Sequence, residues 1–254
     1  MVDPIYILAI ALGVAFLLPV IKKGGTVLFN TVFFMTLASV AAISAAWLYG
    51  FLSKDLQTVQ IFTAGVKPPL SINLQLGISE AFFITAANIL MLVGSIYLFR
   101  LLRSTGVRAY VLYLLLAVGL NGLIMTRDIF NVFVFLEITS IASYALVGIE
   151  LKGKALTSGF RYMVAGNLAS IFLLLGIIFL YSISGTLNID GMIGSAALKQ
   201  GGLLTQLAVF MLLFALFIEM KQFPANGWAL DVYQSVHPGV AALISAGSSG
   251  AIYF

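Results

Sequence analysis

Apolar runs long enough to cross a membrane recur along the whole chain, and they limit it to one class of fold. Hydrophobic residues make up 61% of the 254 residues and charged residues only 9%, and the mean hydropathy is +1.11. A soluble domain of this length carries about a quarter charged residues. No alternating strand pattern separated by tight turns is present, which argues against a β-barrel. We therefore predict an all-α, polytopic helical membrane protein with about eight transmembrane helices.

Polar and glycine-containing segments separate the predicted helices. The helices are expected over about residues 4–21, 26–52, 76–99, 109–125, 126–150 and 156–183, with a seventh from about Leu203 and an eighth from about Pro238. Residues 184–200, rich in small and turn-forming residues, are expected to be a loop. We divide the chain into an N-terminal part, residues 1–108, and a bundle, residues 109–254.

Basic residues predict the orientation in the membrane. The loops after the first, third and fifth helices, with the start of the sixth, hold Lys22, Lys23, Arg100, Arg103, Arg108, Lys152, Lys154 and Arg161. The other loops hold only Lys54, Lys67, Arg127 and Lys199. The positive-inside rule then places the first set of loops in the cytoplasm and the N-terminus outside. We expect a multi-pass protein of the cytoplasmic (inner) membrane.

Charge and cysteine content exclude several other classes. The net charge of +4 fits loops at an anionic membrane surface and does not indicate a nucleic-acid partner. Cysteine is absent, which excludes disulfides, haem attachment and thiolate clusters. The N-terminus has no basic region followed by a cleavage site, so the first helix is expected to be retained. No nucleotide loop or nucleophile–base pair is found, so we expect no active site, no cofactor and no metal on this chain.

Glu137 is the first candidate functional residue, because it lies near the middle of an apolar run. Nine residues separate it from Asp128, which is roughly 13 Å along a helix. That distance places it near the midplane of a hydrocarbon core about 30 Å thick. A carboxylate at this depth is costly and indicates a proton or ion pathway. Ser140 and Tyr144 share its face. The alternative is a neutral glutamic acid held in helix packing by hydrogen bonds.

The seventh helix carries the second group of candidates. It is expected to break at Pro224, because proline has no backbone N–H and its ring clashes with the carbonyl four residues earlier. Broken helices at membrane depth are tolerated where they line protein or a water-filled cavity. Glu219 and Lys221 come just before the break, and on a regular helix they would point to nearly opposite sides. The alternative is that one of them reaches the interface from a shallow helix end.

Two further polar residues have simpler explanations. Glu80 is expected to be an acidic residue at a helix N-terminus. His237, next to Pro238, is expected to be a solvated loop histidine, with a supporting role in ion movement as the alternative.

Three segments resemble one known family: RDIFNVFVFLEITSIASYALVG, FRYMVAGNLASIFLLLGIIFLYSISGTLN, and QFPANGWALD followed by PGVAALISAG. They are similar to the fifth to eighth helices of the antiporter-like subunits of respiratory complex I, the Mrp-type cation antiporters and the membrane-bound hydrogenases, and closest to the Mrp D type. The resemblance covers about residues 127–247 and the N-terminal half of such a subunit. It implies that Glu137 corresponds to a glutamate that takes part in proton movement.

The chain departs from the family pattern at other relay positions. Aligned on Gln222-Phe223-Pro224, Glu219 stands where the family has a lysine, and Lys221 follows two residues later. The cation of the eighth helix would fall near Ser245 or Gly250, and neither residue titrates. The family also has about fourteen helices with a second inverted unit, a common arrangement in transporters. This chain would hold one such unit, incomplete at its end.

Three functions remain open from the sequence. The first is an ion-translocating subunit, with Glu137, Lys221 and Glu219 as relay and Ser140, Tyr144, Arg161, Pro224 and His237 in support. The second is a non-pumping structural subunit of the same kind of complex. The third and weakest is a self-contained channel or uniporter. The expected partners are other membrane subunits, including antiporter-like ones, together with H⁺ or Na⁺ and lipid.

Overall fold

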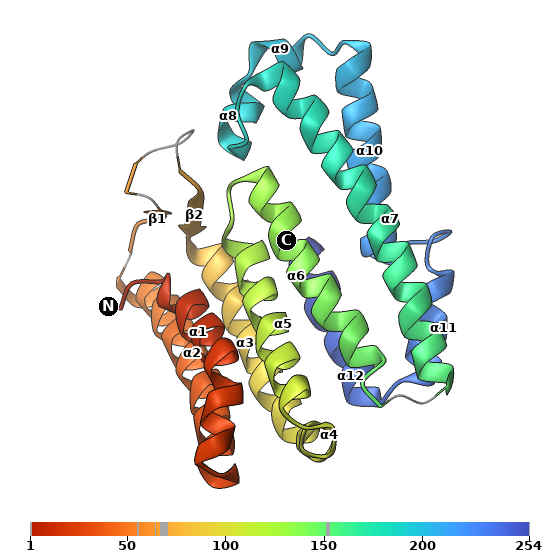
Figure 1. The fold of residues 1–254 in the computed structure, drawn as a ribbon. Coiled ribbons are helices and arrows are strands. Elements are labelled where there is room, and N and C mark those ends of the chain that lie inside the picture. The colour runs from red at the N-terminus through yellow and green to blue at the C-terminus, as the bar shows by residue number, and fades with distance from the viewer. Residues whose placement is uncertain (1, 55, 64, 67–70, 151–152, 254) are drawn as a thin grey trace.

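Helices form almost the whole molecule, and they pack side by side as a bundle (Figure 1). The computed structural model describes residues 2–54, 56–63, 65–66, 71–150 and 153–253. Within these residues, six helices are long and apolar enough to cross a membrane. They are α1 (Tyr6–Ile21, extended by the short helix η1, Lys22–Gly24), α2 (Thr26–Lys54), α3 (Ile78–Tyr97), α5 (Val107–Met125), α6 (Ile129–Val147) and α7 (Gly153–Ser184). The predicted helical membrane fold is confirmed.

Two shorter apolar helical segments complete the bundle. One is α10 (Leu203–Glu219). The other runs from Pro238 and comprises α12 (Pro238–Ala242), the π-helical turn η2 (Leu243–Ser248) and α13 (Ser249–Tyr253). Short helices join the longer ones: α4 (Phe99–Thr105), α8 (Ile189–Gly194), α9 (Ala196–Lys199) and α11 (Gly227–Ser235). The expected loop over residues 184–200 is therefore partly wrong, because α8 and α9 lie within it.

The centre of the bundle is α5, which is buried along nearly its whole length. Figure 1 shows it between the N-terminal helices α1 to α3 and the helices α6 and α7. Asn121 on α5 and Asn88 on α3 exchange two side-chain hydrogen bonds of 2.9 Å, and both are buried. Each side-chain amide thus provides the hydrogen-bond partner of the other inside an apolar core, where an unpaired amide would destabilise the fold. This polar pair fixes α3 against α5.

A β-hairpin and a set of polar contacts close one end of the bundle. Strand β1 (Val59–Phe62) pairs antiparallel with β2 (Asn73–Leu76) in the connection after α2, which the sequence did not predict as strand. Lys67 of that connection lies outside the described residues. Asp128 caps the N-terminus of α6 by accepting a hydrogen bond from the Asn131 backbone N–H at 2.9 Å. Arg127 beside it forms an ion pair of 2.6 Å with Asp190 on α8.

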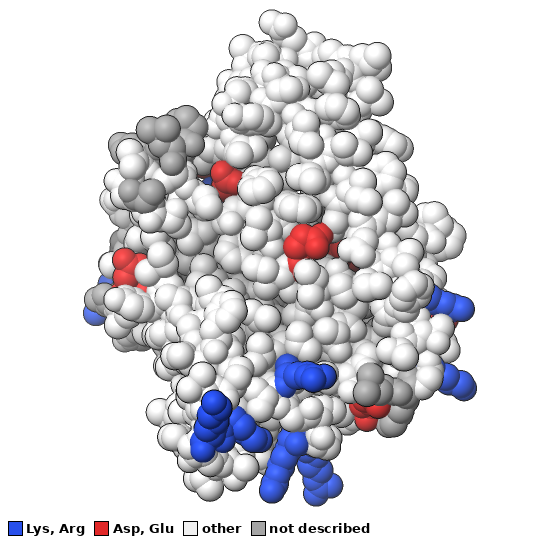
Figure 2. Space-filling view, viewed as in Figure 1, with Lys and Arg blue, Asp and Glu red and all other residues white. Residues whose placement is uncertain are grey.

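The outer surface is apolar along the helices and basic at one end. Figure 2 shows a largely white face, with most of the visible Lys and Arg side chains gathered at its lower end, near α4. The four basic residues Lys22, Lys23, Arg100 and Arg103 belong to that end, where α1 finishes and α4 lies (Figure 1). Lys152 lies outside the described residues. This charge distribution is the one that the positive-inside rule uses.

Candidate functional site

Helix α6 places Glu137 about halfway between the two ends of the bundle, roughly 12 Å along the helix from its first residue. Its side chain is partly buried, while Ser140 and Tyr144 on the same helix are buried. Figure 2 shows acidic atoms in the middle of the white face, over α6. Helix α6 packs closely on α5 at this level. A Cβ added at Gly119 would overlap Thr139, and a Cβ added at Gly122 would overlap Phe135. The glycines of α5 thus fix the position of the carboxylate.

Glu219, the last residue of α10, lies against the same part of α6. Its side chain is only 3% exposed, and it is hydrogen-bonded to the Ser140 hydroxyl. A Cβ built on Gly166 of α7 would lie 3.3 Å from the Tyr144 ring and 3.5 Å from Glu219 Oε1. The absence of a side chain at Gly166 therefore lets Tyr144 and Glu219 meet between α6, α7 and α10.

The break after α10 occurs at the carboxylate itself, before Pro224. Lys221 has a φ of +57°, its backbone N–H bonds to Ile218 O at 3.1 Å, and Gln222 N–H bonds to Phe217 O at 3.0 Å. These two bonds around a left-handed residue form a Schellman helix end, in which glycine is the usual residue at the left-handed position. The break is confirmed, but Pro224 itself lies in the exposed turn that leads to α11.

This helix end corrects the expectation that Glu219 and Lys221 point to opposite sides. That expectation assumed a regular helix through residue 221, whereas α10 ends at Glu219. The two charges now act directly on each other, and the charge of Glu137 acts on Glu219 as well. The three ionisable groups therefore form one electrostatic unit.

Lys221 also joins this unit to the segment that follows Pro238. Its Nζ donates a hydrogen bond to the Ile244 carbonyl at 3.3 Å. Ile244 belongs to the π-helical turn η2, and such turns occur frequently at functional sites. Lys221, Tyr233 and Ser245 line one small pocket. Ser245, at the position expected for a second cation, thus lies beside Lys221.

Stacked aromatic rings form a wall around the charges. Tyr144 meets Tyr162 edge to face at 5.1 Å between ring centroids, and Tyr162 stacks on Trp228 at 4.4 Å. Lys221 Nζ lies 5.9 Å from the centre of the Trp228 ring, close enough for a cation–π contact. These contacts connect α6, α7 and α11 beside the charged groups.

Several buried polar atoms at this site have no hydrogen-bond partner among the described residues. They are Glu137 Oε1, Tyr144 Oη, Ser170 Oγ, Glu219 Oε1 and Trp228 Nε1. Most buried polar atoms in native structures are paired with protein or ordered water. A cluster of such atoms from four helices is the arrangement expected of a hydrated polar path.

The remaining sequence candidates lie outside this cluster. Arg161 forms an ion pair with Asp231 of α11, and both side chains are substantially exposed. His237 is only partly exposed and caps α12, where its Nδ1 accepts a hydrogen bond from Gly239 N–H at 3.2 Å. The expected solvated loop histidine is thus replaced by a capping residue. Glu80 caps α3 through the Gly77 N–H at 2.9 Å, as predicted.

Four contributors to the site were missed by the sequence analysis: Gly166, Tyr162, Trp228 and the Ile244 carbonyl. A glycine inside a long apolar helix signals close approach, so Gly166 could have been found. The two aromatic residues resemble ordinary core residues in the sequence. The Ile244 carbonyl depends on a π-helical turn that no residue pattern indicates.

Comparison with known proteins gives consistent matches. The family model described as NADH:quinone oxidoreductase/Mrp antiporter, transmembrane, matches residues 126–253. NADH-quinone oxidoreductase subunit N of Desulforudis audaxviator is 35% identical over 137 residues, which are 54% of this chain and 27% of that protein. A subunit of the Na⁺/H⁺ antiporter of Bacillus subtilis, of the D type, is 30% identical over 84% of this chain and 44% of its own length.

Solved structures agree over nearly the full chain. A chain of the membrane-bound sulfane sulfur reductase, an archaeal respiratory membrane complex, superposes with a TM-score of 0.91 at 30% identity, covering 98% of this chain and 51% of that one. A chain of the Mrp complex from Dietzia gives 0.83 at 26% identity, covering 99% and 47%. The present chain therefore spans about half the length of these relatives, or less.

Proposed function

Because the chain belongs to the family of NADH:quinone oxidoreductase and Mrp antiporter transmembrane subunits, we propose that it translocates H⁺ or Na⁺ across the cytoplasmic membrane as part of a multisubunit complex. The observation that supports this most is the electrostatic coupling of Glu137, Glu219 and Lys221 in one cluster, in which Glu219 is buried and the other two are partly buried. Their side chains come from α6, from the end of α10 and from the break that follows. Buried ionisable groups at membrane depth are functional candidates by default.

In the proposed mechanism, Glu137 takes up and releases the translocated proton, and Lys221 controls the step. Lys221 can contact Glu219 or the Ile244 carbonyl, since both lie within its reach. An ammonium group near the carboxylates favours their ionised form and thus proton release. Displacement of Lys221 toward η2 favours proton uptake. Both carboxylate charges act on Tyr144, and Ser140 is bonded to Glu219, so the proposed path passes these two side chains.

The proposed partners are other membrane subunits, including antiporter-like ones. Three similar chains come from multisubunit membrane complexes. Glu137 is also only partly buried by this chain, and a partly exposed carboxylate in an apolar face needs a protein neighbour or water. A partner that packs on α6 would provide that neighbour.

A specific observation also favours the second function, a non-pumping structural subunit. Glu219 replaces the lysine that the resemblance implies, and Ser245 lies near the position expected for the cation of the eighth helix. Under this alternative, other subunits carry the ions and the present chain transmits movement or seals the complex.

Replacing Glu137 by Gln distinguishes the two functions. The amide keeps the size of the side chain and most of its hydrogen-bonding capacity but cannot carry the proton. In vesicles that hold the whole complex, we expect Glu137→Gln to abolish formation of the ion gradient while assembly stays intact. Lys221→Ala is expected to lower the rate without abolishing it. Wild-type gradient formation by an assembled Glu137→Gln complex would support the structural function instead.

A further inference from the structure

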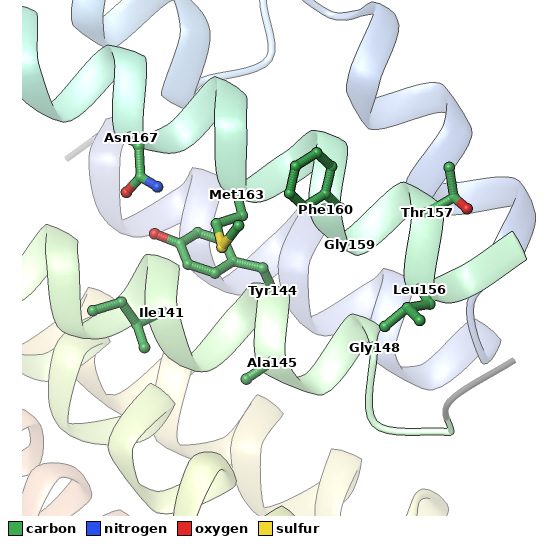
Figure 3. A pocket seen from close by; sticks show the side chains of 10 residues that line it. All are labelled: Ile141, Tyr144, Ala145, Gly148, Leu156, Thr157, Gly159, Phe160, Met163 and Asn167. Carbon is green, nitrogen blue, oxygen red and sulfur yellow. The ribbon is translucent and has the colours of Figure 1, made fainter. Parts of the chain in front are cut away.

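A long groove runs between α6 and α7 on the outside of the bundle. Its cavity is about 900 Å³, within the range of pockets that bind small molecules. Figure 3 shows Asn167 and Ile141 at one end, with the Tyr144 ring next to them, and Leu156 and Thr157 at the other end. The middle is lined by Ala145, Phe160 and Met163. Thr157 and Asn167 are ten residues apart on α7, roughly 15 Å, which is half the thickness of a hydrocarbon core.

A polar pocket adjoins the apolar groove at its Thr157 end. Thr157 lines both, and the polar pocket also includes Lys154, Ser158, Arg161 and Asp231. Arg161 pairs with Asp231, and its guanidinium has further N–H donors available. Lys154 is exposed and forms no ion pair within the described part of the chain. The pocket therefore carries a net positive charge.

We propose that the groove and the polar pocket together bind one anionic phospholipid. One acyl chain lies along Phe160 and Ala145 toward the Tyr144 ring, and the phosphate lies between Lys154 and Arg161. Basic pockets between transmembrane helices on the cytoplasmic side are known to bind anionic headgroups. Lys154 belongs to the predicted cytoplasmic loop, and the apolar groove continues from it to mid-membrane depth. A polypeptide helix would use the apolar groove but would leave the basic pocket without an anion.

The proposal also suggests what the lipid does. The groove ends at Tyr144, whose ring packs against Gly166 beside Glu219. An acyl chain there fills the space between α6 and α7 and excludes bulk water from that side of the cluster. Lipid binding is a separate property from ion translocation and does not depend on it.

Photochemical labelling in the purified whole complex tests the site. The complex is reconstituted in vesicles containing a phosphatidylglycerol with a diazirine in its acyl chain, or the matching phosphatidylcholine. Illumination and mass spectrometry then locate the adducts. We expect adducts from phosphatidylglycerol on residues 141–148 and 156–163, and fewer from phosphatidylcholine. One basic residue near the membrane surface contributes about a fivefold preference for anionic lipid.

Two variants, each with a control, distinguish binding of the lipid headgroup from binding of the acyl chain. Lys154→Gln is expected to lower the phosphatidylglycerol adduct about fivefold, with little change for phosphatidylcholine. Ala145→Phe fills the groove and is expected to remove adducts of both lipids. Lys199→Gln, another exposed lysine, and Val93→Phe, at an exposed position of α3, should leave both unchanged. Equal labelling by the two lipids in the wild type, no effect of Lys154→Gln, or no lipid adduct in the groove would each overturn the proposal.

Discussion

Lys221 combines a structural constraint with a proposed function. It occupies the left-handed position of a helix end with a φ of +57°, where a non-glycine residue costs about 1–2 kcal/mol. Its Nζ reaches Ile244 in η2 at 3.3 Å, and its charge acts on Glu219. Glycine would adopt this conformation without strain, so the simplest reason for a lysine at this position is that its side chain is needed.

Replacing Lys221 by glycine separates the backbone from the side chain. We expect Lys221→Gly to keep or raise the melting temperature of the complex, because it relieves about 1–2 kcal/mol of strain, while it lowers the rate of gradient formation. Lys221→Ala serves as the control, since it removes the charge and keeps the strained backbone. A Lys221→Gly complex with wild-type transport would show that the ammonium group is not used.

At the scale of the elements, the site depends on close contacts between helices. Glycines occur where α5 meets α6 and where α7 meets Tyr144 and Glu219. A larger residue at Gly166 would displace one of these two side chains, because both lie within 3.5 Å of a Cβ at that position. The geometry of the acidic cluster thus depends on a residue that has no polar group.

We therefore expect Gly166→Leu to reduce gradient formation severely, at least tenfold if it moves either side chain by about 1 Å. Gly13→Leu on α1 is the matched control, since nothing lies within 4 Å of a Cβ there. Both variants are compared by transport rate and by yield of the assembled complex. Equal transport rates for the two assembled variants would show that contact at Gly166 does not position the cluster.

The helices were predictable from the sequence because each is encoded by a local apolar pattern. The contacts of the site were not predictable, because they join residues that are far apart in the sequence. The range 126–150 contains α6, and Asp128 and the apolar run define that helix. The strands β1 and β2 are only four residues long, and the turn η2 lies in a run of mixed small and apolar residues, so neither has a distinctive pattern. Glu137 was found because a lone carboxylate in an apolar run is unusual. The resemblance grouped it with Glu219 and Lys221 as a relay, but the geometry of the three could not be predicted, since it depends on where α10 ends.

At the scale of the whole molecule, the charge distribution predicts one orientation. Arg103 on α4 lies at the basic end of the bundle (Figure 1, Figure 2), and the β-hairpin lies at the opposite end (Figure 1). The end with Arg103 is expected to face the cytoplasm. A cysteine at Ser104 should then react with an impermeant thiol reagent only from inside, and a cysteine at Thr63 in the hairpin only from outside. The chain has no cysteine of its own, so no background labelling arises from it. Labelling of Ser104→Cys from outside would reverse the orientation.

The most direct test of the central claim is an infrared pH titration of the carboxylic acid groups in the whole complex. The charge of Glu137 acts on Glu219, and both charges act on Tyr144, so replacing Glu137 should change the titration of Glu219. We predict that Glu219→Gln removes one protonated-carboxyl signal and that Glu137→Gln shifts the midpoint of that signal. Glu80→Gln, which changes a capping residue outside the cluster, should alter neither this signal nor its midpoint. If the signal of Glu219 keeps the same midpoint in the presence and absence of the Glu137 carboxylate, the two carboxylates do not form one proton-handling site.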